Sequence, residues 1–350
     1  MKRIKVLIID DSALVRNILS QGLSLDPEIE VIGTAGDPYI ARDKIVALAP
    51  DVLTLDVEMP RMDGVEFLRR LMPQFPLPVL MVSSLTGRGQ QITLDALEAG
   101  AVDFVTKPSS DVSRGMNEML AELREKVKIV SKANVSGWKC NDYDLSARQA
   151  PPPRRRLTAS SEKIVAIGAS TGGTQALQKV LTRLPASTPA IVIVQHMPAG
   201  FTKLFADRLN DLCAMTVKEA ETGDRVTTGR VLIAPGDKHL RVVREGGVYS
   251  IQIIGGEKVC GHRPSVDVMF RSMAEHVGAH AVGVVLTGMG SDGADALKIM
   301  RSKGARTLAQ DEETSVVFGM PKEAYLRGGA EKLFPIDQIA DAILDLTAGS

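Results

Sequence analysis

Cysteine and net charge are both scarce in this 350-residue chain. Its three cysteines, Cys140, Cys213 and Cys260, are odd in number and show no CxxC spacing, which argues against a disulfide framework or a structural zinc site. Basic and acidic residues both number 42, so no excess charge favours a nucleic-acid groove or an anionic membrane surface. These absences predict a cytoplasmic protein with no nucleic-acid partner.

The chain also lacks a long apolar run at its start. The opening segment MKRIKVLIIDDS carries basic residues and a short apolar run, but that run stops at Asp10 and Asp11. It therefore ends before a signal-peptide cleavage site or a membrane-spanning length is reached. We interpret it as a first β-strand and expect no membrane insertion.

The chain contains two stretches in which apolar runs alternate with helical patterns. Its length of 350 residues is enough for two ordinary domains. Residues 1–125 alternate short apolar runs with helical spacing, which predicts a doubly wound parallel sheet. Residues 126–160 include three consecutive prolines and three consecutive arginines with almost no apolar periodicity, which predicts a flexible linker. Residues 161–350 resume the α/β alternation, with a β-hairpin region expected over 230–254.

Polar residues follow the expected strands of the first domain. Asp10 and Asp11 end the first strand, Asp56 ends the third, Ser83 ends the fourth and Lys107 follows the fifth. Parallel strands bring their carboxyl ends to one edge of a sheet, and crowded carboxylates suit Mg²⁺. We therefore predict a phosphoryl-transfer pocket with Asp56 as nucleophile, Asp10, Asp11 and Asp56 as metal ligands, and Ser83 and Lys107 facing the phosphoryl group. Taken singly, each aspartate also fits a helix N-cap.

A serine on a tight turn marks the second domain. Ser170 lies in the GxSxG segment Gly168–Gly172 between an apolar run and a helical pattern, which suits a nucleophile, although a helix cap or a phosphate loop fits the same pattern. His196 ends the next expected strand, and Asp292 lies in a glycine-flanked loop after a later one. We predict a Ser170, His196, Asp292 triad that needs no metal. Its chain order differs from that of α/β-hydrolases.

Some residues of the second domain stay open. Asp295 competes with Asp292 as the orienting acid, and His262 lies in a loop that suits substrate binding. Arg263 and Asp267 in the same loop fit equally well a structural ion pair or a helix cap. The histidines other than His196 and His262 fit structural or surface roles.

The motifs of the first half resemble those of a known family. IIDDS, LDVEMPRMDG, MVSS and VTKP are similar to a response-regulator receiver domain over residues 1–125. The resemblance implies a flavodoxin-like fold and phosphorylation of Asp56 by a histidine kinase with Mg²⁺ as cofactor. It also implies that Ser83, Phe104 and Lys107 are the residues that respond to the phosphoryl group.

The second half resembles the protein-glutamate methylesterase domain of bacterial chemotaxis over residues 160–347, through AIGASTGGT, VQHMP, APGDKH, HRPSVDVMF, LTGMGSDG and VVFGMP. The resemblance implies a triad of Ser170, His196 and Asp292, with Thr171 beside the nucleophile and the backbone N–H of Met289 at the oxyanion site. It implies hydrolysis of glutamate γ-methyl esters and deamidation of glutamines on chemoreceptor cytoplasmic domains. The alternatives are a DNA-binding response regulator, a general esterase, and a serine esterase or silent adaptor of the same fold in a related pathway.

Overall fold

The structure is a computed structural model that describes residues 2–84, 86–108, 112–139 and 163–348. The chain divides into two compact units, residues 1–144 and 145–350, which are described separately. The larger part of the expected linker, residues 140–160, lies outside the described residues. Helix α5 runs to Val130, so regular structure continues past the first domain boundary expected at residue 125.

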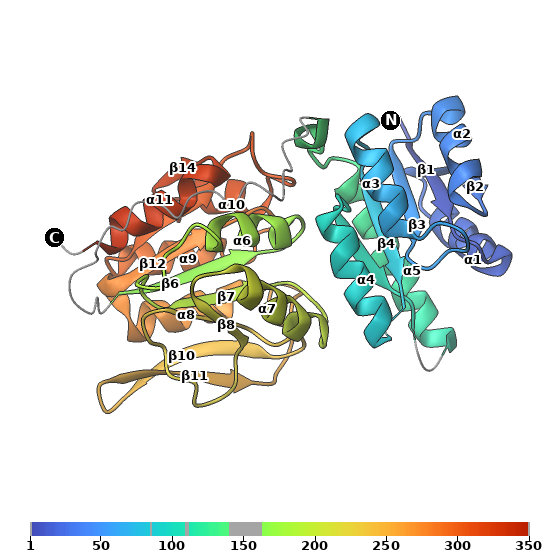
Figure 1. The fold of residues 1–350 in the computed structure, drawn as a ribbon. Helices are drawn as coiled ribbons and strands as arrows, with labels where there is room; N and C mark the ends of the chain where they lie inside the picture. The colour runs from blue at the N-terminus through green and yellow to red at the C-terminus, as the bar shows by residue number, and fades with distance from the viewer. Residues whose placement is uncertain (1, 85, 109–111, 140–162, 349–350) are drawn as a thin grey trace. The chain divides into compact units, whose positions relative to one another are not determined.

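The first unit is a five-stranded parallel sheet in the order β2-β1-β3-β4-β5 (Figure 1). This order is that of flavodoxin-like folds, as predicted from the sequence. Its elements are β1 (Ile4–Ile9), α1 (Ala13–Ser24), β2 (Ile29–Ala35), α2 (Pro38–Leu48), β3 (Val52–Asp56), α3 (Gly64–Gln74), β4 (Val79–Ser83), α4 (Gly87–Glu98), β5 (Asp103–Thr106), α5 (Val112–Val130) and the 3₁₀ turn η1 (Ser136–Lys139).

The second unit is built on a seven-stranded parallel sheet in the order β14-β13-β12-β6-β7-β9-β8 (Figure 1). Its elements are β6 (Ile164–Ala169), α6 (Gly173–Leu181), β7 (Ile191–Gln195), α7 (Phe201–Leu212), β8 (Thr216–Glu219), β9 (Arg230–Ile233), β10 (His239–Glu245), β11 (Val248–Ile254), α8 (Val266–His276), η2 (Gly278–His280), β12 (Ala281–Val285), α9 (Ala294–Ser302), β13 (Arg306–Gln310), α10 (Met320–Leu326), β14 (Lys332–Phe334) and α11 (Ile336–Thr347).

The sheet of the second unit is covered on both faces, which explains its apolar central strands. Helix α6 contacts α7 and α11, whereas α8 contacts α9, and α9 contacts α10. Every residue of β6, β7 and β12 is buried, as expected for parallel strands between two helical layers. The strand order reverses at β6, so the carboxyl end of β6 lies at a topological switch point, where doubly wound folds place their ligands.

The hairpin region differs in part from the prediction. Strands β10 and β11 form an antiparallel hairpin in a sheet of their own, and β10 packs against α8, where Ser272 accepts a hydrogen bond from the backbone of Val242 at 3.0 Å. Strand β9, which we expected in the hairpin, instead pairs parallel with β7 and β8. In the described part of the chain, no helix has the length and apolar character that crossing a bilayer requires.

Candidate active site

Ser170 and His196 are neighbours because each follows directly on a paired strand. The last register pair of β6 and β7 is Ala169 with Gln195, and the backbone N–H of His196 donates to the carbonyl oxygen of Ala169 at 3.2 Å. On the other side of β6, the Ser170 N–H donates to the carbonyl oxygen of Thr287 at 3.0 Å. The nucleophile candidate is thus held between the ends of β7 and β12, at the switch point of the sheet.

Gln195 fixes the backbone of this pair. Its side chain is buried, and its Nε2 donates to the carbonyl oxygens of Ser170 at 2.9 Å and His196 at 3.4 Å. Gln195 was not predicted from the sequence; the signal available there was an amide side chain at the end of an apolar run. By joining the two turns, Gln195 sets the backbone spacing from which the serine and histidine side chains start.

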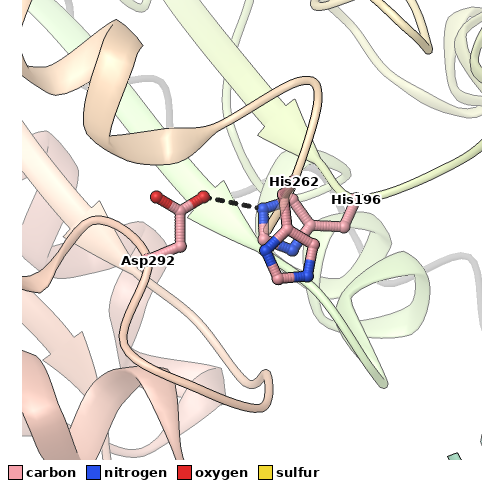
Figure 2. A group of neighbouring side chains, drawn as sticks. All are labelled: His196, His262 and Asp292. Atoms are coloured by element: carbon pink, nitrogen blue, oxygen red, sulfur yellow. Dashed lines mark hydrogen bonds and ion pairs between the residues drawn. The ribbon is translucent and has the colours of Figure 1, made fainter. Parts of the chain in front are cut away.

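His196 is oriented by Asp292, and not by the competing Asp295. Nε2 of His196 lies 2.9 Å from Oδ2 of Asp292 (Figure 2), and both side chains are almost fully buried. Asp295, in the first turn of α9, is instead exposed and pairs with Arg327. Because Asp292 accepts from Nε2, the other nitrogen of His196, Nδ1, remains for proton transfer. Nδ1 is buried and has no partner among the described residues, so it is not hydrogen-bonded to the Ser170 hydroxyl.

Four donors surround the Asp292 carboxylate. Oδ1 accepts from the Ser265 hydroxyl at 2.8 Å and from the Asp267 N–H at 3.0 Å, and Oδ2 accepts from the Val266 N–H at 2.7 Å as well as from His196. Burial by itself raises the pKa of Asp292, but the hydrogen bonds from His196 and from the start of α8 outweigh it, so the pKa is lowered. Asp292 is therefore a fixed, ionised partner for the histidine.

The loop that carries Asp292 is held by Asp267 in return. Oδ1 of Asp267, in the first turn of α8, accepts from the backbone N–H groups of Gly293 at 3.1 Å and Ala296 at 3.2 Å, at the start of α9. Asp292 accepts from the start of α8 in the same way, so the two helices cap each other. Of the two roles left open by the sequence, an ion pair between Arg263 and Asp267 is not the one formed, because Asp267 pairs with Arg271 and Arg263 pairs with Asp237. Asp267 does cap a helix, but that helix is α9 and not the one that it begins.

The oxyanion candidate lies on the loop after β12. Gly288 packs on Ser170, and its carbonyl oxygen accepts from Gly319 at 3.1 Å and Met320 at 2.8 Å. The next residue, Met289, is exposed, and its N–H makes no hydrogen bond to another described residue. Thr171 is buried, and its carbonyl oxygen accepts from the Thr287 hydroxyl at 3.0 Å. The loop thus leaves a backbone donor free beside the serine.

Replacing Gly288 with alanine should slow reactions of Ser170 by about a hundredfold, the cost of displacing a reacting group by about 1 Å. A Cβ at this position would lie 2.7 Å from the Ser170 Cβ and 2.5 Å from the Met320 sulfur. The rate of Ser170 labelling by a fluorophosphonate measures the effect. Gly255→Ala is the control, since its Cβ would meet nothing within 4 Å. Equal labelling rates for wild type and Gly288→Ala would contradict the packing described.

His262 joins the site from the loop before α8. Its ring lies parallel to that of His196, with centroids 3.8 Å apart and planes 6° apart (Figure 2). His196, His262 and Asp292 offer nitrogen and oxygen atoms within 4.8 Å of one another, a spacing that raises the question of a metal. A metal ion binds imidazole nitrogen along its lone pair, close to the ring plane, and two stacked planes do not share such a position. The stack therefore argues for a contact between the rings.

The carboxylates predicted in the first unit also meet. Oxygens of Asp10, Asp11 and Asp56 lie within 4.8 Å of one another, and Lys107 Nζ lies 3.1 Å from Asp10 and 3.0 Å from Asp56. Burial, assisted by the charge of Asp10, raises the pKa of Asp56 to about 6 against the opposing effect of Lys107. A set of carboxylate oxygens of this kind, two of them from the buried Asp10 and Asp56, fits a hard divalent cation.

The remaining residues of the first unit lie at the same edge of the sheet. Ser83 is fully buried, and its hydroxyl hydrogen-bonds with the Thr93 hydroxyl and donates to the Gly89 carbonyl oxygen at 3.3 Å, both on α4. Phe104 is buried in β5, and Lys126 of α5 lies over its ring at 5.4 Å. The Ser83 hydroxyl is therefore directed to α4 in this structure, and it would have to turn to meet a phosphoryl group on Asp56.

Known proteins are similar to both halves of the chain. The family model for CheB methylesterase matches residues 165–343, and that for the response regulator receiver domain matches residues 6–118. The chain is 65% identical to the protein-glutamate methylesterase/protein-glutamine glutaminase of Syntrophotalea carbinolica, covering 99% of this chain and 98% of that protein. It is 50% identical to the Salmonella typhimurium protein of the same name, covering 98% of this chain and 97% of that one.

A solved structure extends the similarity to three dimensions. The CheB methylesterase catalytic domain of Thermotoga maritima superposes with a TM-score of 0.52 at 42% sequence identity, covering 53% of this chain and 98% of that structure. Its match supports the second unit as a catalytic domain of the same fold. The chain therefore belongs to the CheB methylesterase family, with a response-regulator receiver domain preceding the methylesterase domain.

Proposed function

We propose that this protein hydrolyses γ-methyl esters of glutamate on the cytoplasmic domains of chemoreceptors, deamidates glutamines at such sites, and does so under control of phosphorylation of Asp56. The proposal is carried by one observation: Ser170 and His196 follow directly on the paired strands β6 and β7, and His196 is hydrogen-bonded to Asp292, in a chain of the CheB methylesterase family. The three side chains are those that acyl transfer by a serine requires.

The acylation step follows from which histidine nitrogen is free. Asp292 holds Nε2–H, so Nδ1 accepts the proton of the Ser170 hydroxyl as its oxygen attacks the ester carbonyl carbon. The carbonyl oxygen of the substrate becomes an anion in the tetrahedral intermediate. The Met289 N–H donates a hydrogen bond to this oxygen, and the partial positive charge at the N-terminus of α6 stabilises it further. When the intermediate collapses, Nδ1 returns the proton to the leaving methoxide, which departs as methanol.

The second half of the reaction regenerates the serine. A water molecule gives a proton to Nδ1 as its oxygen attacks the acyl carbon. Nδ1 then returns that proton to the Ser170 oxygen as the bond between this oxygen and the acyl carbon breaks, and the released glutamate side chain ionises to a carboxylate. With a glutamine substrate the acylation step releases ammonia in place of methanol, and the acyl-enzyme is the same. One arrangement of Ser170, His196 and Asp292 therefore serves both activities.

The receiver half supplies the control. Asp10, Asp11 and Asp56 would hold Mg²⁺, which when bound neutralises part of the negative charge of the phosphoryl group. Asp56 is the phosphoryl acceptor, with a histidine kinase as donor, and Lys107 lies close enough to pair with a phosphoryl oxygen. Ser83 would leave Thr93 and Gly89 of α4 to donate to the same group, and this exchange of partners shifts the receiver between two arrangements.

The test is methanol release from methylated chemoreceptor cytoplasmic fragments by the full chain, with and without a small phosphodonor and Mg²⁺. We expect the phosphodonor to raise the rate, and a chelator or Asp56→Asn to remove the increase, because both act on the phosphoryl site. Asp43→Asn is the matched control, since Asp43 is an exposed receiver aspartate paired with Arg42. Absence of methanol under every condition would refute the proposed substrate. Equal rates with and without phosphodonor would refute regulation by phosphorylation of Asp56.

A further inference from the structure

His262 covers one face of the His196 ring. The 3.8 Å separation and 6° angle are those of two rings in full contact (Figure 2). His262 is half-buried, whereas His196 is almost enclosed between the stack and Asp292. The proposed reaction uses the nitrogens of His196 and leaves His262 without a role.

A tight turn presents the His262 ring. Val259 and His262 exchange backbone hydrogen bonds at 3.0 and 2.9 Å, and the two residues between them, Cys260 and Gly261, have positive φ values of 51° and 81°, as a type I′ turn requires. The Nδ1 of His262 lies 2.8 Å from the Cys260 carbonyl oxygen. Since a carbonyl oxygen only accepts, Nδ1 carries the proton and the orientation of the ring is set.

The loop that bears this turn is fastened at both ends by His239. The His239 ring is buried; its Nε2 donates to the Glu257 carbonyl oxygen at 2.9 Å and its Nδ1 accepts from the Ser265 N–H at 3.2 Å. Between these points, Arg263 Nε donates to Asp237 at 2.9 Å. The ring of His262 is thus carried on a segment whose position is determined before any substrate arrives.

The surroundings of His262 keep it uncharged. Burial lowers its pKa to about 4, assisted by His196 and Lys258 and opposed by Asp292. The groups that face it are therefore one histidine, one lysine and one carboxylate, and at neutral pH its ring is neutral. A neutral ring beside His196 adds no positive charge that would oppose the imidazolium formed in each half of the reaction.

We propose that His262 is a positioning residue for His196: its stacked ring holds the His196 imidazole in the plane that joins Asp292 to Ser170 and offers a neutral face to the imidazolium. This role of His262 rests on the proposed function only in that methyl-ester hydrolysis is taken as the reaction that it serves. Activation of Ser170 by His196 is a property that a serine-directed reagent also reports. His262 itself neither bonds to the serine nor transfers the proton.

The test separates the ring from its hydrogen bond. His262→Phe keeps a stacking ring and loses Nδ1–H, whereas His262→Asn keeps a donor for the Cys260 carbonyl oxygen and loses the ring. We expect kcat for methanol release to fall about tenfold to a hundredfold in His262→Ala and His262→Asn, with KM for the receptor fragment unchanged. His262→Phe should recover most of the wild-type kcat. His276→Ala, at the far end of α8, is the control.

Fluorophosphonate labelling of Ser170 in the full chain provides the second readout. The labelling rates should rank as kcat does, with wild type and His262→Phe fast and His262→Ala and His262→Asn slow. A wild type that labels but releases no methanol would refute the methyl-ester substrate and leave the role of His262 intact. Labelling as slow in His262→Phe as in His262→Asn, or as fast in His262→Asn as in wild type, would overturn the positioning role. Melting temperatures measured alongside show whether each variant keeps its fold.

Discussion

Replacing Ser170 with alanine should reduce methanol release from methylated receptor fragments by about 10⁶-fold in kcat, the scale on which a lost serine nucleophile acts in a triad. The change removes the atom that attacks the ester and little else. In the described part of the chain the Ser170 hydroxyl makes no hydrogen bond, and its Cβ already packs against Gly288. The catalytic domain should therefore keep its stability, and the receiver should still accept a phosphoryl group.

The matched control for this experiment is Ser291→Ala. Ser291 lies on the loop that carries Met289 and Asp292, and its backbone carbonyl, which the substitution keeps, accepts from Ala294. We expect it to retain wild-type activity. Methanol release by Ser170→Ala at more than a trace of the wild-type rate, measured by gas chromatography after removal of contaminating esterase, would show that another group is the nucleophile.

Asp292→Asn should lower kcat by about 10⁴-fold and also destabilise the catalytic domain by about 1–3 kcal/mol. Each carboxylate oxygen accepts one backbone N–H, from Asp267 at Oδ1 and from Val266 at Oδ2. Whichever way an asparagine amide is turned, its NH₂ group faces a buried N–H donor. When it replaces Oδ2, it also faces Nε2 of His196 and favours the wrong tautomer.

Asp295→Asn is the control for this prediction. Asp295 is exposed, and its ion pair with Arg327 at 2.9 Å is a surface pair, whose loss costs less than about 1 kcal/mol. Activity and urea unfolding of both variants should be compared at neutral pH. If Asp295→Asn is the more damaging of the two, or if Asp292→Asn unfolds like wild type, the acid of the triad has been assigned wrongly.

The central strands and the residues at their ends were predictable from the sequence. Buried parallel strands are recognisable as short apolar runs, and their carboxyl ends lie at one edge of the sheet. That rule was enough to place Ser170 beside His196, and the acidic cluster beside Lys107. The short edge strands β8 and β14 were not foreseen, nor was the parallel pairing of β9 with β7. Edge strands of three or four residues carry too few apolar positions to show a pattern.

The surroundings of the triad were beyond the sequence for a different reason. The mutual capping of α8 and α9, the turn that carries His262 and the links made by Gln195 and His239 all join segments far apart in the chain. Their residue types are ordinary for helix starts and loops, so only the packing of the domain assigns their partners. Likewise, spacing alone did not reveal which nitrogen of His196 faces Asp292.

The exchange of caps between α8 and α9 couples catalytic activity to the docking of these two helices. Asp292 satisfies the first turn of one helix while orienting His196, and Asp267 satisfies the first turn of the other. Any fluctuation that separates the two helices removes the orienting carboxylate from the histidine at the same moment. Partly opened forms of the domain, such as those that proteases cleave, are therefore inactive. The hydrolytic rate is proportional to the fraction of molecules in which both helices are docked.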